Sequence, residues 1–98
     1  MDSCVTDCLE CFKACNDCAY NCRIGNDEHK ECLKNCLICA EICSLCAKLC
    51  ILKGDIAKKI KSLCAEICNI CASECEKFQD ERCKICAQAC RKCAQSCG

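Results

Sequence analysis

Cysteines recur along this chain at alternating intervals of three and four residues. They form four groups, separated by short segments without cysteine. In chain order the cysteines are Cys4, Cys8, Cys11, Cys15, Cys18, Cys22; Cys32, Cys36, Cys39, Cys43, Cys46, Cys50; Cys64, Cys68, Cys71, Cys75; and Cys83, Cys86, Cys90, Cys93, Cys97. This alternation is the period of one face of an α-helix, whereas a β-strand alternates every two residues. The pattern therefore predicts an internal repeat of four helices, each with a face of cysteine.

The breaks between the groups contain residues that are typical of helix ends. In "RIGNDEH" Gly25 is placed to end one helix and Asp27 to begin the next. The segment "LKGDIAKK" repeats this arrangement with Gly54 and Asp55, and in "KFQDERC" the expected N-cap is Asp80. The expected helices then cover residues 3–24, 28–52, 55–77 and 80–97.

Short connections make consecutive helices antiparallel neighbours. The sequence therefore predicts an all-α chain that forms a single domain over residues 1–98, an up-down-up-down antiparallel four-helix bundle with a cysteine-lined core. At a rise of about 1.5 Å per residue, the inward-facing cysteines would form a column of thiols about 30 Å long.

The two ends of this column are expected to differ in polarity. The end with the first and third connections is polar and carries Asn26, Asp27, Glu28, His29, Gln79 and Asp80. The other end holds the termini and carries the apolar residues Ile51, Leu52, Ile56, Ile60 and Leu63. We expect the polar end to admit ligands, and the five apolar side chains to plug the other end.

Composition excludes several classes of function. The chain has 14 basic and 14 acidic residues, so its formal net charge of zero does not indicate nucleic acid or an anionic membrane as a partner. Its apolar runs are too short for a membrane span, and "MDSCVTDC" lacks an apolar signal region. A single histidine and three scattered glycines offer no catalytic arrangement or phosphate loop, so we do not expect an enzyme. We expect a cytosolic protein whose thiols are mostly reduced.

A chain with 21 cysteines raises the alternative of a disulfide scaffold. The odd number of cysteines, the missing signal region and the absence of proline argue against it. Cysteine is smaller than the leucine expected at such positions, and each unfilled cavity costs on the order of 2–5 kcal/mol. Clustered thiols are natural ligands for a soft metal. We therefore interpret all 21 cysteines as metal ligands.

Charge favours Cu(I) among the soft metals. Ten Cys-x-x-x-Cys pairs cover every cysteine except Cys83, and one Cu⁺ per thiolate leaves the core neutral. An isolated zinc site with four thiolates would carry a charge of about −2. Iron–sulfur cubanes are also anionic, and they are too wide for layers about 5 Å apart. Zinc or cadmium clusters with bridging thiolates can be neutral, so these ions and iron–sulfur clusters stay open as alternatives.

The repeated text "CLKNCLICAEIC", "CAEICNICASEC" and "CKICAQACRKC" resembles the bacterial copper storage proteins over nearly the whole chain. The resemblance implies a four-helix bundle whose lumen holds many Cu(I) ions, and a role in copper storage and detoxification. The missing signal region is similar to the cytosolic branch of that family, which often has histidines before the last helix. Here that connection, "EKFQDERC", has no histidine. His29, at the same end, is therefore the candidate for admitting copper, with an exposed first-turn histidine as the alternative.

The second and third helices carry additional apolar stripes, each one residue before the cysteine stripe. The stripes are Ile38, Ile42, Leu45, Leu49 and Leu52, and Ile56, Ile60, Leu63, Ile67 and Ile70. They either seal a seam inside the bundle or form an exposed interface. Because the family resemblance implies oligomers, we expect a homo-oligomer formed through these two helices.

Four functions remain open. They are Cu(I) storage, binding of iron–sulfur clusters for storage or electron transfer, buffering of zinc or cadmium, and a purely structural helical oligomer. A copper chaperone fits less well, because it needs one exposed Cys-x-x-Cys motif rather than a buried set of 21 thiols.

Overall fold

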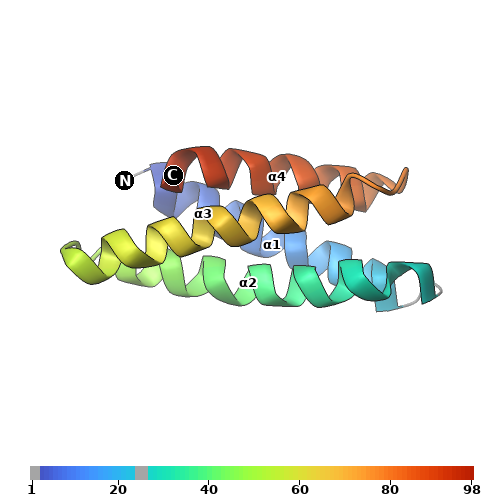
Figure 1. The fold of residues 1–98 in the computed structure, drawn as a ribbon, viewed down its shortest axis with the longest axis horizontal. Coiled ribbons are helices and arrows are strands. Elements are labelled where there is room, and N and C mark those ends of the chain that lie inside the picture. The colour runs from blue at the N-terminus through green and yellow to red at the C-terminus, as the bar shows by residue number, and fades with distance from the viewer. Residues whose placement is uncertain (1–2, 24–26) are drawn as a thin grey trace.

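The computed structural model describes residues 3–23 and 27–98, except for the side chains of Arg23 and Asp27. Four α-helices lie within these ranges, and the described residues contain no β-strand (Figure 1). The helices are α1 (Ser3–Arg23), α2 (Lys30–Cys50), α3 (Asp55–Cys75) and α4 (Glu81–Cys97), with a short 3₁₀ helix over Asp27–His29 before α2. The sequence prediction of an all-α chain with four helices is confirmed.

The helices form an elongated bundle that measures 42 × 17 × 17 Å. Consecutive helices run antiparallel, α1 packs beside α2 and α4, and α3 packs beside the same two helices. Both termini lie at the end of the bundle where α2 turns into α3 (Figure 1). The predicted up-down-up-down topology is therefore confirmed.

The cysteine stripes face inward along the whole bundle. All 21 cysteines lie within the described ranges, and none is more than 5% exposed. The rest of the core consists mainly of alanines beside the cysteine stripes, together with Val5. Because cysteine and alanine side chains are small, neighbouring helices can pack closely. The interior consists largely of cysteine sulfur atoms.

The predicted helix ends agree best at α4. The Asp80 carboxylate accepts a hydrogen bond from the Arg82 backbone N–H at 3.0 Å, as expected for an N-cap. At α3 the N-cap position belongs to Gly54, so the prediction that Asp55 caps this helix is wrong. Lys53 and Gly54 both have positive φ angles, 61° and 91°, and this left-handed turn sets where α3 begins.

The connection before α2 also differs from the prediction. His29 occupies the N-cap position of α2, after the 3₁₀ turn, and its side chain makes no capping hydrogen bond. The predicted helix end at Gly25 and the polar residue Asn26 lie outside the described residues, as does the side chain of Asp27. The α2 helix ends at Cys50 and α3 at Cys75, two residues earlier than expected in both cases.

The apolar plug predicted for the terminal end is largely wrong. Ile51, Leu52 and Ile56 are 65%, 74% and 61% exposed, and Leu63 is 44% exposed. Only Ile60 of the five packs partly against the core. The early end of α2 and the left-handed turn after it leave the first three of these side chains on the outside of the connection.

The second apolar stripes divide between the two interpretations. Ile42, Ile60 and Ile67 are partly buried and pack against the cysteine core. Ile38, Leu45 and Ile70 are 45%, 43% and 53% exposed. Each stripe therefore helps to seal the seam between α2 and α3, and also leaves an apolar edge on the outer surface of the chain.

Polar contacts on the outer surface tie neighbouring helices together. Arg91 of α4 donates hydrogen bonds to Glu76 at 3.1 and 2.9 Å, and to Asn69 of α3 at 3.0 Å. Ser96 of α4 donates to the buried Asp7 of α1. Among the helices that the structure describes, none combines the length and the apolar content that a membrane crossing requires.

Candidate metal centre

Sulfur atoms form a continuous column along the bundle axis. Near the middle, the Sγ atom of Cys90 lies 3.6 Å from that of Cys11, 3.8 Å from Cys15 and 3.9 Å from Cys39. These four Sγ atoms come from α1, α2 and α4, and all lie within 4.8 Å of one another. Residues far apart in the sequence thus form a compact set of soft ligands.

The column extends to the end with the first and third connections, which we call the His29 end. There the Sγ atom of Cys18 lies 3.5 Å from Cys83 and 3.8 Å from Cys32, and Cys32 lies 3.6 Å from Cys75. All four helices contribute to this group. The antiparallel topology therefore brings cysteines from all four helices together, as expected for a cysteine-lined core.

The opposite end, which we call the terminal end, holds the two termini and the α2–α3 connection. The Sγ atom of Cys4 lies 3.8 Å from Cys50 and 4.0 Å from Cys46. Cys8 follows, 4.0 Å from Cys64 and 3.6 Å from Cys97. The column therefore spans the bundle from one end to the other without a layer of larger side chains.

Eight of the ten Cys-x-x-x-Cys pairs have Sγ atoms no more than 4.0 Å apart. They are 4/8, 11/15, 32/36, 39/43, 46/50, 64/68, 86/90 and 93/97. The shortest separation is 3.4 Å, between Cys46 and Cys50. Two thiolates one helical turn apart can hold a low-coordinate soft ion between them.

Several cysteines belong to more than one possible ligand set. Cys11 and Cys39 lie in a group with Cys15 and Cys90, and also in a group with Cys43 and Cys68. A sulfur atom shared between two sets can bridge two metal ions. The arrangement therefore suits a chain of linked metal–thiolate sites better than separate sites.

One pair of cysteines is joined in this structure. Cys4 and Cys97 form a disulfide between α1 and α4, and the other 19 cysteines are free. Both residues lie close to Cys8, at 3.9 and 3.6 Å. They are placed to join the ligand set once the disulfide is reduced.

Burial and mutual hydrogen bonding shift the acidity of the thiols. Burial raises the pKa of Cys22 to about 11, and burial also raises the pKa values of Cys46 and Cys83. Hydrogen bonding with Cys15 holds the pKa of Cys36 lower, at about 6. Burial therefore favours the protonated form of Cys22, Cys46 and Cys83, which lie towards the two ends of the column.

His29 lies against the column at its own end of the bundle. Its Nδ1 atom is 3.7 Å from the Sγ atom of Cys22, and its ring stacks on Phe78 with centroids 4.3 Å apart. His29 is half-buried, which does not match a freely exposed first-turn histidine. Sequence reasoning missed Phe78; the signal was a lone aromatic residue in an otherwise polar connection.

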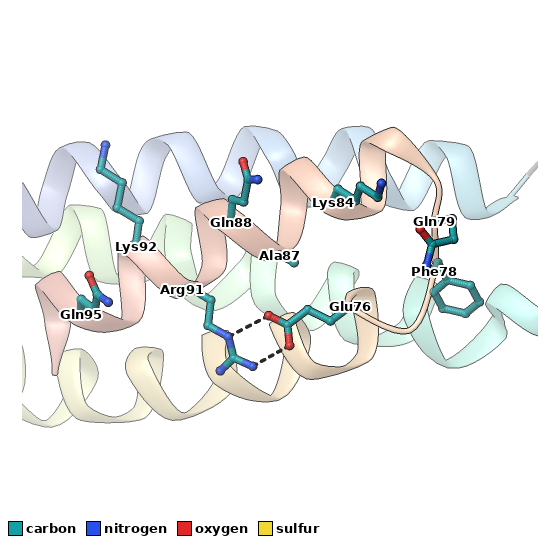
Figure 2. A pocket seen from close by; sticks show the side chains of 9 residues that line it. All are labelled: Glu76, Phe78, Gln79, Lys84, Ala87, Gln88, Arg91, Lys92 and Gln95. Atoms are coloured by element: carbon teal, nitrogen blue, oxygen red, sulfur yellow. Dashed lines mark hydrogen bonds and ion pairs between the residues drawn. The ribbon is translucent and has the colours of Figure 1, made fainter.

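A separate hollow lies on the outside of α4, facing the end of α3 (Figure 2). Its volume is about 510 Å³, and two of its lining residues, Arg91 and Glu76, are hydrogen-bonded to each other. Its nine lining residues include no cysteine or histidine. This hollow is a polar groove on the surface and is not part of the sulfur column.

Fold and column together define a class of protein: a four-helix bundle whose interior is built to hold soft metal ions. The sequence model of the family described as "Copper storage protein" matches residues 1–98, and the chain belongs to that family. The resemblance inferred from the repeated cysteine motifs is thereby confirmed.

Solved structures agree with this assignment. The chain is similar to the Cu(I)-bound copper storage protein BsCsp3, with 37% identity, a TM-score of 0.91, and coverage of 97% of this chain and 92% of that one. The apo copper storage protein 3 from Bacillus subtilis gives the same identity and coverage, with a TM-score of 0.92. The copper storage protein Ccsp from Streptomyces lividans, loaded with 10 copper equivalents, is 30% identical with a TM-score of 0.92, over 97% of this chain and 78% of that one.

A curated relative from Bacillus subtilis strain 168, an uncharacterized cysteine-rich protein named YhjQ, is 37% identical over 105 residues. The alignment covers 98% of this chain and 91% of the relative.

Proposed function

We propose that this protein stores many Cu(I) ions as cargo, bound by the thiolates of its 21 cysteines, and so removes free copper from solution. The observation that carries the proposal is the unbroken column of Sγ atoms, in which neighbouring sulfur atoms lie about 3.4–4.0 Å apart. Family membership supports copper as the cargo. Relatives with the same fold have been solved with copper bound.

Loading exchanges protons for copper at each sulfur atom. A thiol releases its proton as the Cu–S bond forms, so one Cu⁺ per thiolate leaves the core uncharged. Neutrality matters because the residues that the structure describes include no buried lysine or arginine to offset net negative charge. Divalent ions reach neutrality only with about two thiolates each, so the same column holds about twice as many Cu(I) ions.

Copper is proposed to enter at the His29 end. The Nδ1 atom of His29 and the Sγ atom of Cys22 provide two ligands near the surface, since Cys22 is 4% exposed. From Cys22 an ion moves to the group formed by Cys18, Cys32 and Cys83. Each transfer is an exchange between neighbouring ligands and requires no movement of a helix.

Other parts of the proposal rest on the sequence. The protein acts in the cytosol as a single domain over residues 1–98, it is not an enzyme, and it does not bind nucleic acid or membranes.

The exposed apolar edge of α2 and α3 supports a homo-oligomer. Ile38 and Leu45 line a hollow of about 490 Å³ on this face, together with Ile42 and Ile67.

An anaerobic titration tests the storage function. The protein is fully reduced, which opens the Cys4–Cys97 disulfide, and is then titrated with Cu(I) against a competing chromogenic chelator. We expect uptake of about one copper per thiolate, with the helical circular dichroism retained. A matched variant with Cys39→Ser and Cys90→Ser, at the centre of the column, should bind fewer ions than the natural chain.

Other outcomes favour the alternatives. Saturation at a few Cu(I) ions overturns the storage function. Brown, oxygen-sensitive protein from anaerobic cells indicates iron–sulfur clusters. Saturation with about one divalent ion per two or three thiolates, with weak Cu(I) binding, indicates a zinc or cadmium buffer.

A further inference from the structure

A small cavity opens at the terminal end, beside the turn between α2 and α3. Its volume is about 210 Å³, and it is lined by Cys50, Ala57 and Gly54 together with Lys53, Lys58 and Lys61. At about 30 Å³ per water molecule, it has room for a small head group but not for a large ligand. Cys50 and three lysines therefore line one small cavity.

Cys50 is one of the least buried cysteines of the protein. All cysteines lie in the described ranges, and only Cys22, Cys50 and Cys97 have any exposed surface, at 4%, 5% and 5%. Cys97 is joined to Cys4 in this structure, and Cys50 is the other cysteine with exposed surface at the terminal end.

Cys50 also belongs to the sulfur column. Its Sγ atom lies 3.4 Å from that of Cys46 and 3.8 Å from that of Cys4. An ion received at Cys50 is therefore within one ligand exchange of the column. Cys50 therefore belongs both to the lining of this cavity and to the end of the sulfur column opposite His29.

The charge at this end differs from that at the other. Five lysines and one aspartate lie between Lys48 and Lys61, although the whole chain has a formal net charge of zero. The α3–α4 connection at the His29 end is acidic instead, with four carboxylates and one lysine between Glu74 and Glu81. A basic opening attracts anions and raises their association rate, whereas an acidic one favours cations.

We propose that the cavity formed by Cys50, Lys53 and Lys58 is a docking site for an anionic low-molecular-weight Cu(I)–thiolate complex, which passes its copper to Cys50. The inference rests on the proposed storage function. The lysines attract the carboxylates of the complex, and the Cu–S head enters the cavity. The bond from copper to the donor sulfur breaks as the bond to Cys50 Sγ forms, and the proton of the Cys50 thiol leaves on the donor thiolate. Copper stays Cu(I) throughout.

Stopped-flow uptake with two copper donors tests this site. The fully reduced protein is mixed anaerobically with the anionic Cu(I) complex of glutathione or, separately, with the cationic Cu(I) complex of acetonitrile. Formation of protein Cu(I)–thiolate bonds is followed by ultraviolet absorbance. Lys53→Glu with Lys58→Glu should slow uptake from the glutathione complex about tenfold at low salt, and leave uptake from the acetonitrile complex no slower. Lys53→Arg with Lys58→Arg should keep the natural rate.

A matched control separates local charge from net charge. Lys34→Glu with Lys84→Glu makes the same change in net charge on exposed residues away from the cavity. This variant should keep the natural rate with the glutathione complex. Equal slowing by both glutamate pairs, or no slowing by either, overturns the docking site.

The final capacity, measured in the same samples, distinguishes the two proposals. If the protein loads fully but the uptake rate is unchanged by the substitutions at Lys53 and Lys58, the docking site is refuted and the storage function is not. A natural chain that saturates at a few ions with either donor refutes the storage function, and the docking site with it.

Discussion

The Nδ1 atom of His29 lies 3.7 Å from the Sγ atom of Cys22, so the chain's one histidine meets the cysteine at its own end of the column. The imidazole is held in this position by stacking on Phe78, with an interplanar angle of 23°. A half-buried ring fixed in this way places a ring nitrogen beside a thiol. The relationship links the edge of the column to the surface without opening the bundle.

Replacing this histidine should change the rate of copper uptake. His29→Ala removes the nitrogen ligand beside Cys22, so loading from the cationic acetonitrile complex should slow several-fold. The loss of capacity should be no more than about one ion, because the remaining column is intact. Stopped-flow absorbance and the chelator titration measure the two quantities. Phe78→Leu removes the stacking partner but keeps the ring nitrogen, so it should slow uptake less than His29→Ala. An equal uptake rate for His29→Ala and the natural chain would contradict a role of His29 in copper entry.

The acidity of the buried thiols gives the reduced apo protein a defined pH dependence. Burial at Cys22 and hydrogen bonding with Cys11 at Cys90 raise the pKa of each thiol to about 11, from a usual value of 9.0. A raised pKa means that the folded state favours the protonated thiol. The stabilisation from these two groups is therefore present below pH 9 and is lost as the pH rises towards about 11.

Denaturant unfolding of the reduced apo protein should show this loss. We expect the midpoint to fall as the pH rises from 9 to about 11, and Cys22→Ala to make the fall shallower. A midpoint that stays constant or rises over this range would refute the assignment. Copper binding should have the opposite sign of dependence and weaken as the pH falls, because protons compete with Cu(I) for the thiolates.

The cysteine column was predictable because a helical period depends only on residue spacing. Intervals of three and four place Cys11, Cys15 and Cys18 on one face in any straight helix, and antiparallel neighbours then fix which cysteines meet. The helix ends were less predictable. Lys53 adopts a positive φ that its side chain does not favour, and this turn exposes Ile51 and Leu52 rather than burying them.

Contacts between distant residues were not predictable from spacing. The stacking of His29 on Phe78 joins two connections that are far apart in the sequence, and no periodic signal marks it. The cavity beside Cys50 depends on where the turn places Lys53 and Lys58, so it also required coordinates. The spacing of the cysteines therefore predicted the sulfur column, whereas the surroundings of His29 and Cys50 depend on irregular backbone that has no periodic signal.

The N-cap of α4 should contribute measurably to stability. The Asp80 carboxylate accepts hydrogen bonds from the Arg82 backbone N–H at 3.0 Å and from the Asn21 side chain at 2.6 Å. Asp80→Ala removes both acceptors and should lower the free energy of unfolding of the reduced apo protein by about 1 kcal/mol or somewhat more. Asp80→Asn keeps an acceptor oxygen for the cap and should be clearly milder in urea titrations. Equal losses for the two variants would show that the charge, and not the cap, stabilises this helix.

The exposed apolar edge of α2 should control assembly. Ile38 and Leu45 are 45% and 43% exposed, and covering them with a second copy removes apolar surface worth on the order of 1 kcal/mol per side chain. Sedimentation velocity should therefore find a homo-oligomer for the natural chain and a monomer for Ile38→Glu with Leu45→Glu. Leu9→Glu is the control, because Leu9 is 50% exposed on α1, outside this edge, and its replacement should leave the oligomer intact. A monomeric natural chain at micromolar concentration, or loss of the oligomer in the Leu9 variant, would show that α2 and α3 do not form the interface. Copper capacity per chain should be unchanged in all of these variants, since the sulfur column is complete within one chain.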